Sequence, residues 1–350
     1  MNQRKAIIKN LLRSLPFSSI IVKYDYYFSN TVLSDTKELN MWSVTYLKDD
    51  RLVIGLKRNI EIRNLNTQEI KTLIGHREEV NIIKTLSDDR IVSGSGDMTL
   101  RIWDSNTGNC LHILRGHTSY ISEIAILPDD RIVSGEGQGG NGNIRIWNPD
   151  TGICEKILAD NMGLISSIIV LNNDEIANIT QEDNDIRIWN INNGILRIKL
   201  LGHTNYIYQL EKYSKNQIIS ASHDGTIVIW DIKTGNYDKI LYIDNAVIIY
   251  VLKDMIIAGS SNGLITVWKN EKLYIQIQGH STQITFFGML PDNRLISATN
   301  NGEIKIWDLD TGTLDMILDK YIKNIMNIKV LKNNQLVIID IIEDRIIILE

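Results

Sequence analysis

Residues Gly75–Asp104 read GHREEVNIIKTLSDDRIVSGSGDMTLRIWD, and this stretch decides the fold. It predicts three short strands, Val80–Leu86, Arg90–Ser93 and Thr99–Trp103, separated by a polar Ser-Asp-Asp turn and a Gly-Asp turn. Three short strands cannot bury their own faces, so the unit needs similar neighbours beside it.

The chain repeats this unit at a nearly constant period. Aligned on its last two residues, the unit ends at Arg63-Asn64, Trp103-Asp104, Trp147-Asn148, Trp189-Asn190, Trp230-Asp231, Trp268-Lys269, Trp307-Asp308 and Leu349-Glu350. A Gly-His pair recurs in phase at Gly75-His76, Gly116-His117, Gly202-His203 and Gly279-His280. Clusters of Asp, Asn, Gly and Pro fall between the runs and predict tight turns, so the whole chain is expected to be all-β.

A period near 40 residues with Gly-His and Trp-Asp marks resembles the WD40-repeat proteins over roughly residues 27–350. The resemblance implies a β-propeller with four strands per blade. The last unit, with strands near Ile325–Leu331, Gln335–Ile339 and Ile346–Leu349, lacks a fourth strand, whereas Tyr27–Leu33 is an extra strand before the first unit. We therefore expect residues 27–350 to form an eight-bladed WD40 β-propeller, closed by this N-terminal outer strand.

Composition favours a soluble, intracellular protein. The net charge is -5 with both signs interspersed, so nucleic-acid binding is not expected. The 2 cysteines, Cys110 and Cys154, fit a reducing compartment and no disulfide framework. The sequence shows no signal peptide and no run long enough to span a bilayer. We expect a cytoplasmic monomer, in the host cytoplasm if the protein is viral.

Residues 1–26 are expected to form a short helical extension. Arg4–Arg13 has the apolar spacing of an amphipathic helix, and Leu15-Pro16 ends it. A set of five residues is similar to the start of an F-box, which docks substrate receptors onto a Skp1-type adaptor: Leu15, Pro16, Ile20, Ile21 and Tyr24. Only about half of an F-box fits before Tyr27, and the stretch is also similar to WD-repeat proteins of giant DNA viruses. The alternatives are a helix that packs on the propeller rim and a membrane-surface helix.

Two units carry the same four polar residue types at matched offsets. His76, Ser93, Asp97 and Trp103 correspond to His203, Ser220, Asp224 and Trp230, and the His and Trp of each unit lie 27 residues apart. Ser, His and Asp together could indicate nucleophilic catalysis, but an enzyme needs such a site once. The resemblance to WD40 proteins implies a structural tetrad, in which carboxylate, imidazole, hydroxyl and indole N–H are hydrogen-bonded in series.

Other units carry the tetrad incompletely. His117, Ser134 and Trp147 lack a clear Asp, and His280, Ser297 and Trp307 have Asn301 where Asp is expected. Asn161 stands in place of the His in the fourth unit.

Function is expected to lie on one face of the propeller. The loop after each outer strand and the loop before each Trp strand share that face, and they supply a candidate partner-binding set: Arg77, Glu79, Tyr120, Tyr206, His223, Gln283 and Tyr321. Exposed aromatic residues and Arg are typical interface anchors. No spacing of Cys or His predicts a metal site, and no catalytic residue or cofactor is expected.

The sequence thus predicts a non-catalytic scaffold that binds other proteins or peptides. One alternative is a substrate receptor of a cullin-type ubiquitin ligase, acting through the F-box-like segment. A second is a propeller that binds nucleic acid or lipid through a local basic patch. An enzyme is the third and would need a site that the sequence does not show.

Overall fold

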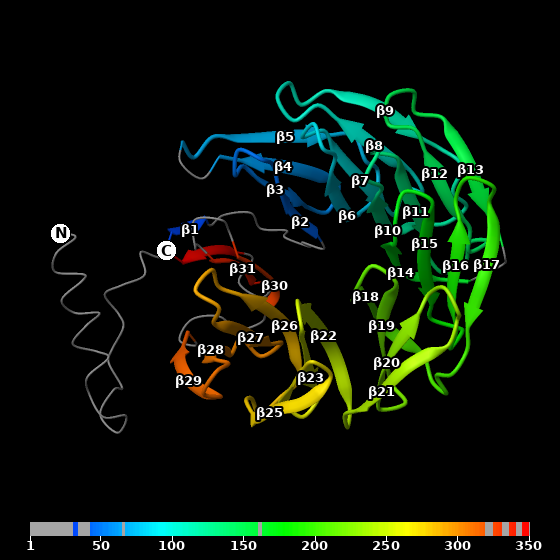
Figure 1. Cartoon of the computed structure of the whole chain (residues 1–350). Coiled ribbons are helices and arrows are strands. Elements are labelled where there is room, and N and C mark those ends of the chain that lie inside the picture. Colours follow the sequence, from blue (N-terminus) through cyan, green and yellow to red (C-terminus); the bar gives the residue numbers. More distant parts are fainter. Residues whose placement is uncertain are drawn as a thin grey trace.

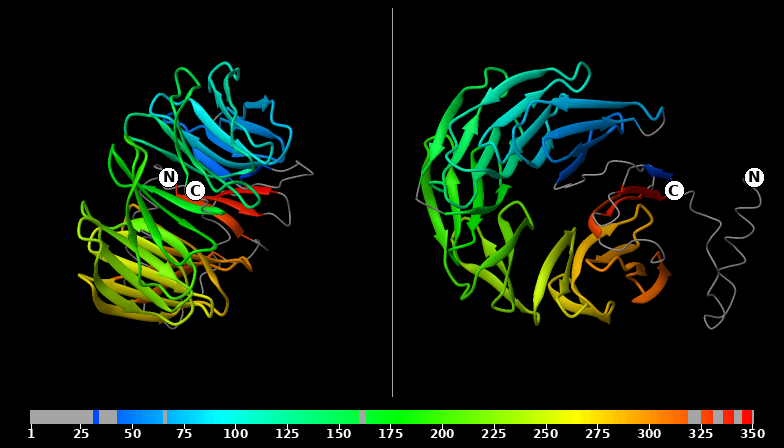
Figure 2. Two further views of the ribbon diagram at one scale, coloured as in Figure 1. Left: turned by 90° about the vertical axis from the view of Figure 1, so that its right-hand side faces the viewer. Right: turned by 180° about the vertical axis from the view of Figure 1, so that it is seen from behind.

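The computed structural model describes residues 31–33, 43–64, 67–159, 163–318, 325–330, 336–340 and 345–349. Within these ranges the chain forms strands and turns only, arranged as radial sheets around a centre (Figure 1). Figure 2 shows the same sheets from the side and from behind. The all-β propeller fold predicted from the repeat is confirmed.

Seven consecutive sheets, called blades one to seven, follow the chain. Blade one is β2 (Ser43–Tyr46), β3 (Leu52–Gly55), β4 (Asn59–Arg63) and β5 (Ile70–Ile74). Blade two is β6 (Val80–Thr85), β7 (Ile91–Ser95), β8 (Leu100–Trp103) and β9 (Cys110–Leu114). Blade three is β10 (Ile121–Ile126), β11 (Ile132–Glu136), β12 (Ile144–Trp147) and β13 (Cys154–Leu158). Blade four is β14 (Ile165–Val170), β15 (Glu175–Thr180), β16 (Ile186–Asn190) and β17 (Ile195–Leu200).

The remaining blades have the same order of strands. Blade five is β18 (Ile207–Lys212), β19 (Gln217–Ser222), β20 (Thr226–Asp231) and β21 (Tyr237–Tyr242). Blade six is β22 (Ala246–Leu252), β23 (Met255–Ser260), β24 (Leu264–Lys269) and β25 (Lys272–Gln278). Blade seven is β26 (Ile284–Met289), β27 (Leu295–Thr299), β28 (Ile304–Asp308) and β29 (Thr313–Ile317).

An eighth four-stranded sheet joins the two ends of the chain. Its order is β1 (Thr31–Leu33), β32 (Arg345–Leu349), β31 (Leu336–Asp340) and β30 (Ile325–Val330). β1 pairs antiparallel with β32, with Thr31 opposite Ile348 and Leu33 opposite Ile346. The expected N-terminal strand therefore takes the outer position of this sheet; the part of it before Thr31 lies outside the described residues.

The innermost strands of successive sheets pack side by side from β2 and β6 through to β26 and β30. Figure 1 shows a wider separation between the two ends of this arc, blade one and the eighth sheet. A closed ring of eight blades therefore stays a prediction.

The hydrophobic core lies between neighbouring sheets. Each apolar cluster joins two consecutive blades; one, for example, holds Ile60 of blade one together with Ile91 and Trp103 of blade two. The repeated Trp fills this space, since Trp103, Trp147 and Trp230 are each only 1% exposed. Because a single sheet has two apolar faces, only the next blade can bury them, which explains why the unit is repeated.

The turns between the first and second strands lie on one face, called here the lower face. As the Asp- and Asn-rich clusters predicted, Asp50, Asp89, Asp130 and Asn293 have positive φ there, between 65° and 67°. Two of these carboxylates also join blades: the Lys48 N–H donates to Asp89 at 3.0 Å, and the Ser87 N–H donates to Asp130 at 2.8 Å.

Candidate functional site: the upper face and the networks that support it

The structure brings the four predicted tetrad residues together in blade two. Asp97 Oδ2 lies 2.9 Å from His76 Nδ1, His76 Nε2 lies 2.8 Å from Ser93 Oγ, and Trp103 Nε1 donates to the same Oγ at 2.9 Å. A carboxylate can only accept, so His76 Nδ1 carries the hydrogen and Nε2 accepts from the Ser93 hydroxyl. Each polar atom of the series thus has a partner, which ties together β7, β8 and the two loops that carry His76 and Asp97.

Blade five has the same geometry. His203 Nδ1 lies 2.8 Å from Asp224 Oδ2, His203 Nε2 lies 2.7 Å from Ser220 Oγ, and Trp230 Nε1 donates to that Oγ at 2.7 Å. Burial lowers the pKa of His203 and outweighs the opposing contact with Asp224, so the imidazole is neutral near pH 7. Burial would raise the pKa of Asp224, but hydrogen bonds from Thr226, Thr204 and His203 lower it overall.

In blade three the missing carboxylate is Glu136. It lies on β11, with Oε2 at 3.4 Å from His117 Nδ1, while Ser134 Oγ bonds His117 Nε2 at 2.6 Å and Trp147 Nε1 at 2.8 Å. The 3.4 Å contact is not a hydrogen bond, so His117 Nδ1 has no hydrogen-bond partner among the described residues. Burial would raise the pKa of Glu136, but its contact with His117 and backbone N–H donors lower it to about 2.

In blade seven the structure corrects the assignment of Asn301. His280 Nδ1 contacts Glu303 Oε2 at 2.7 Å, whereas Asn301 Oδ1 accepts from the Thr299 hydroxyl. Ser297 Oγ bonds His280 Nε2 at 2.6 Å and accepts from Trp307 Nε1 at 2.8 Å. Glu303 follows the turn glycine, and its longer side chain reaches back to the imidazole.

Blade four differs more. Asn178 Oδ1 accepts from Trp189 Nε1 at 2.9 Å, in the place where blades two, three, five and seven use a serine hydroxyl. Asn161, predicted at the His position, lies outside the described residues.

These networks leave no hydroxyl open to a substrate. Ser93, Ser134, Ser220 and Ser297 are all 0% exposed, and each already accepts from an indole N–H. A nucleophile must reach its substrate, so the geometry supports fastening of the blades and gives no sign of acyl transfer.

The tetrads lie beneath the opposite face, called here the upper face. It is formed by the connection from each outer strand to the next blade and by the connection between each blade's second and third strands. Arg77 and Gln283 are exposed on it, and Glu79 is half-buried. Tyr321 and the proposed adaptor-docking residues Leu15, Pro16, Ile20, Ile21 and Tyr24 lie outside the described residues.

Two tyrosines of this face have equivalent places in blades three and five. The Tyr120 ring covers Gly137, where an added Cβ would lie 2.1 Å from Cζ of the ring. The Tyr206 ring stacks on His223 with 4.0 Å between ring centroids. In both blades the tyrosine carbonyl accepts a backbone N–H, from Gly137 at 2.8 Å and from His223 at 3.1 Å. The structure therefore pairs Tyr206 with His223, a contact that the sequence did not reveal.

Neither a cluster of metal-ligand side chains nor a long apolar helix occurs in the described part of the chain. No group of three or more His, Cys, Asp or Glu residues there could hold a metal ion. In the same ranges no helix is long and apolar enough to cross a membrane.

The radial sheets and the recurring buried networks define a repeat-built β-propeller. Four segments match the family described as "WD domain, G-beta repeat", at residues 67–104, 108–148, 194–231 and 271–308. The chain therefore contains WD40 repeats, as the resemblance predicted.

Curated relatives match over parts of their length. "Autophagy-related protein 16" of Arabidopsis thaliana is 26% identical over 136 residues, which is 37% of this chain and 27% of that protein. "DENN domain and WD repeat-containing protein SCD1" of the same plant is 28% identical over 210 residues, 59% of this chain and 14% of that protein. This chain thus matches less than a third of either relative's length.

Among solved structures, the crystal structure of the computationally designed Ika8 protein is similar, with a TM-score of 0.78 and 24% identity. The match covers 91% of this chain and 98% of that chain. It shows a shared fold and nothing about activity.

Proposed function

We propose that this protein is a non-catalytic scaffold that binds other proteins through the upper face of its propeller. The observation that carries the proposal is the pair of exposed tyrosines, Tyr120 and Tyr206, held at equivalent places above two buried networks. Their exposed fractions are 36% and 39%, so each ring packs on one side, against Gly137 or His223, and is exposed to solvent on the other. Rigid aromatic side chains anchor interfaces at low entropic cost.

The comparisons support the same proposal. Four segments match WD40 repeats, and WD40 propellers typically bind proteins without catalysing a reaction. The step from a fold to a role is an analogy, so the binding surface itself needs a direct test.

Affinity purification with mass spectrometry tests the proposal. We expect the double variant Tyr120→Ala/Tyr206→Ala to lose the partners that the full chain captures. Tyr274→Ala is the matched control, because Tyr274 is 42% exposed on the outer strand β25, away from the upper face. Equal capture by all three proteins would refute binding through the upper face.

The finer proposal of a ubiquitin-ligase receptor rests on the F-box-like residues of the N-terminal segment. Purification of the full chain and of a version that lacks residues 1–22 tests it, since the truncation keeps β1. We expect a Skp1-class or cullin partner with the full chain only. Identical partner sets without ligase components would refute the receptor proposal, and residues 1–26 would then be an extension that belongs to the fold.

A further inference from the structure

Several apolar and aromatic side chains are exposed on the upper face at blade five. Leu201 is 69% exposed, Tyr206 39% and Tyr242 77%, and His223 is also exposed. We call these four residues the blade-five patch. Leu201 and Tyr206 lie between β17 and β18, His223 lies between β19 and β20, and Tyr242 is the last residue of β21.

The patch is held rigid from below. Leu201 and Tyr206 flank His203, and His223 precedes Asp224, so the tetrad of blade five fixes both loops. The His223 ring also meets Tyr208 edge-on at 5.4 Å, beneath its stack with Tyr206. The Ile243 N–H donates to the Gly225 carbonyl at 3.0 Å, which keeps the end of β21 beside the same turn. A surface that is already ordered loses little entropy when a partner binds.

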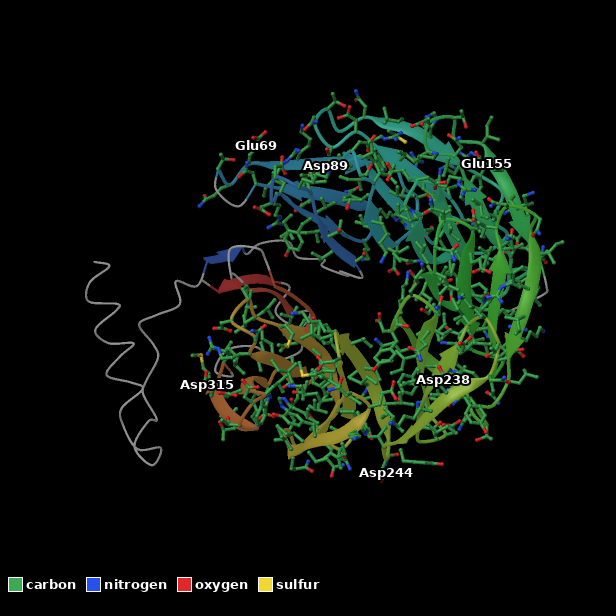
Figure 3. The ribbon with its side chains drawn as sticks, in the orientation of Figure 1. Glu69, Asp89, Glu155, Asp238, Asp244 and Asp315 are labelled. Carbon is green, nitrogen blue, oxygen red and sulfur yellow. The ribbon has the colours of Figure 1, made fainter. Side chains whose placement is uncertain are left out.

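The upper-face loops around the patch are acidic, and the nearby cations Arg187 and Lys199 lie on strands, where they contact Asp183 and Asp185. The described upper-face loops of blades four to six contain no Lys or Arg, and their acidic residues are Glu182, Asp183, Asp185, Asp224 and Asp244. Asp183 and Asp185 are paired with Arg187, and Asp224 belongs to the tetrad. Glu182 and Asp244 are exposed and form no ion pair within the described ranges, and Figure 3 shows Asp244 near the end of β21.

We propose that the blade-five patch docks an extended segment of a partner protein in which Lys or Arg residues neighbour an aromatic or aliphatic residue. The apolar residue would pack on Tyr206, Tyr242 and Leu201, and the cations would face Glu182 and Asp244. Uncompensated carboxylates beside an apolar surface favour a cationic partner and repel an acidic one or a nucleic acid. This inference rests on the proposed function and specifies the chemistry of the partner.

A selection from a random twelve-residue peptide library, displayed on phage and panned on the purified full chain, tests the inference. We expect enriched peptides to combine Lys or Arg with aromatic or aliphatic residues. The most enriched peptide is then synthesised with a fluorophore, and its dissociation constant is measured by fluorescence anisotropy. Enrichment of acidic or uncharged peptides, or no enrichment, would overturn the inference.

Three variants locate the binding surface. Tyr206→Ala should weaken the peptide about 10-fold or more, since it removes an interface anchor. Asp244→Lys should weaken it and reduce the salt dependence of the affinity. Tyr274→Ala should leave it unchanged. Because Asp244 is exposed, Asp244→Lys should not affect folding, and it keeps the test valid if Tyr206→Ala lowers the melting temperature. Unchanged affinity in both Tyr206→Ala and Asp244→Lys would overturn the inference.

Failure here is distinguishable from failure of the scaffold proposal. In one outcome, Tyr120→Ala/Tyr206→Ala loses its captured partners, but Tyr206→Ala and Asp244→Lys bind the selected peptide with unchanged affinity. The upper face would then still bind proteins. Only the assignment of a cationic segment to blade five would then be wrong.

Discussion

Replacing Ser220 with alanine removes one oxygen from the middle of the blade-five network. That oxygen accepts from Trp230 Nε1 and bonds His203 Nε2, both at 2.7 Å, in a site that is 0% exposed at the serine. The substitution leaves a buried indole N–H and a buried imidazole nitrogen without partners. Each unsatisfied group costs about 1–3 kcal/mol, so the free energy of unfolding should fall by about 2–6 kcal/mol.

Thermal unfolding followed by calorimetry measures this loss. At about 2.1 cal/mol/K per residue, a cooperative chain of 350 residues has an unfolding entropy near 0.7 kcal/mol/K, so the melting temperature should fall by about 3–8 °C. Ser261→Ala is the control, because Ser261 is exposed on blade six and only its backbone N–H is bonded, to the Asn245 carbonyl. A melting temperature within 1 °C of the parent for Ser220→Ala would refute the network as a source of stability.

Three further predictions concern the blade-five network, the buried groups of blade three, and a contact between blades two and three. Asp224→Asn keeps the shape of the side chain but replaces the charged acceptor of the His203 Nδ1–H with a neutral, weaker one, and we expect a lower melting temperature in calorimetry. Stability in urea should fall steadily from pH 7 to pH 3. The pKa of His117 is lowered by burial, so protonation below about pH 6.5 favours the unfolded chain, and the Glu136 pKa near 2 means that its contribution is lost as pH falls from about 4.5. A flat urea midpoint over this range would contradict both assignments. Arg90→Ala removes a hydrogen bond of 3.1 Å to the Pro149 carbonyl of the next blade, and urea titration should show a loss of about 1 kcal/mol.

The sequence predicted the fold and two tetrads because both depend on local, repeated spacing. Ser93 and Ser220 stand 10 residues before their Trp, and the structure pairs Trp103 and Trp230 with them. A pattern that recurs in phase is a strong signal, since each copy meets the same neighbours.

The missed carboxylates show where such reasoning stops. Glu136 is the last residue of β11, and the loop that follows it, before the Trp147 strand, is lengthened. Glu303 follows the turn glycine of its blade. Neither lies at the offset of Asp97 or Asp224, yet a longer side chain at a shifted position still reaches the histidine. Spacing identifies a network only when backbone and side-chain length both repeat.

The ring contact between His223 and Tyr206 was missed for a related reason. It joins residues 17 positions apart on two loops, and no repeat of the chain places another His there. Loop contacts that occur once leave no periodic trace in a sequence.

The pairing of β1 with β32 also determines how the molecule would respond to a pulling force. The first residue of β1, Thr31, lies opposite Ile348, so the chain enters and leaves this pair at the same end. Tension applied through the two termini would therefore unzip the three registered pairs one after another, rather than shear them together. Mechanical load would open the propeller at this sheet first, at low force, while the blades behind it stay folded.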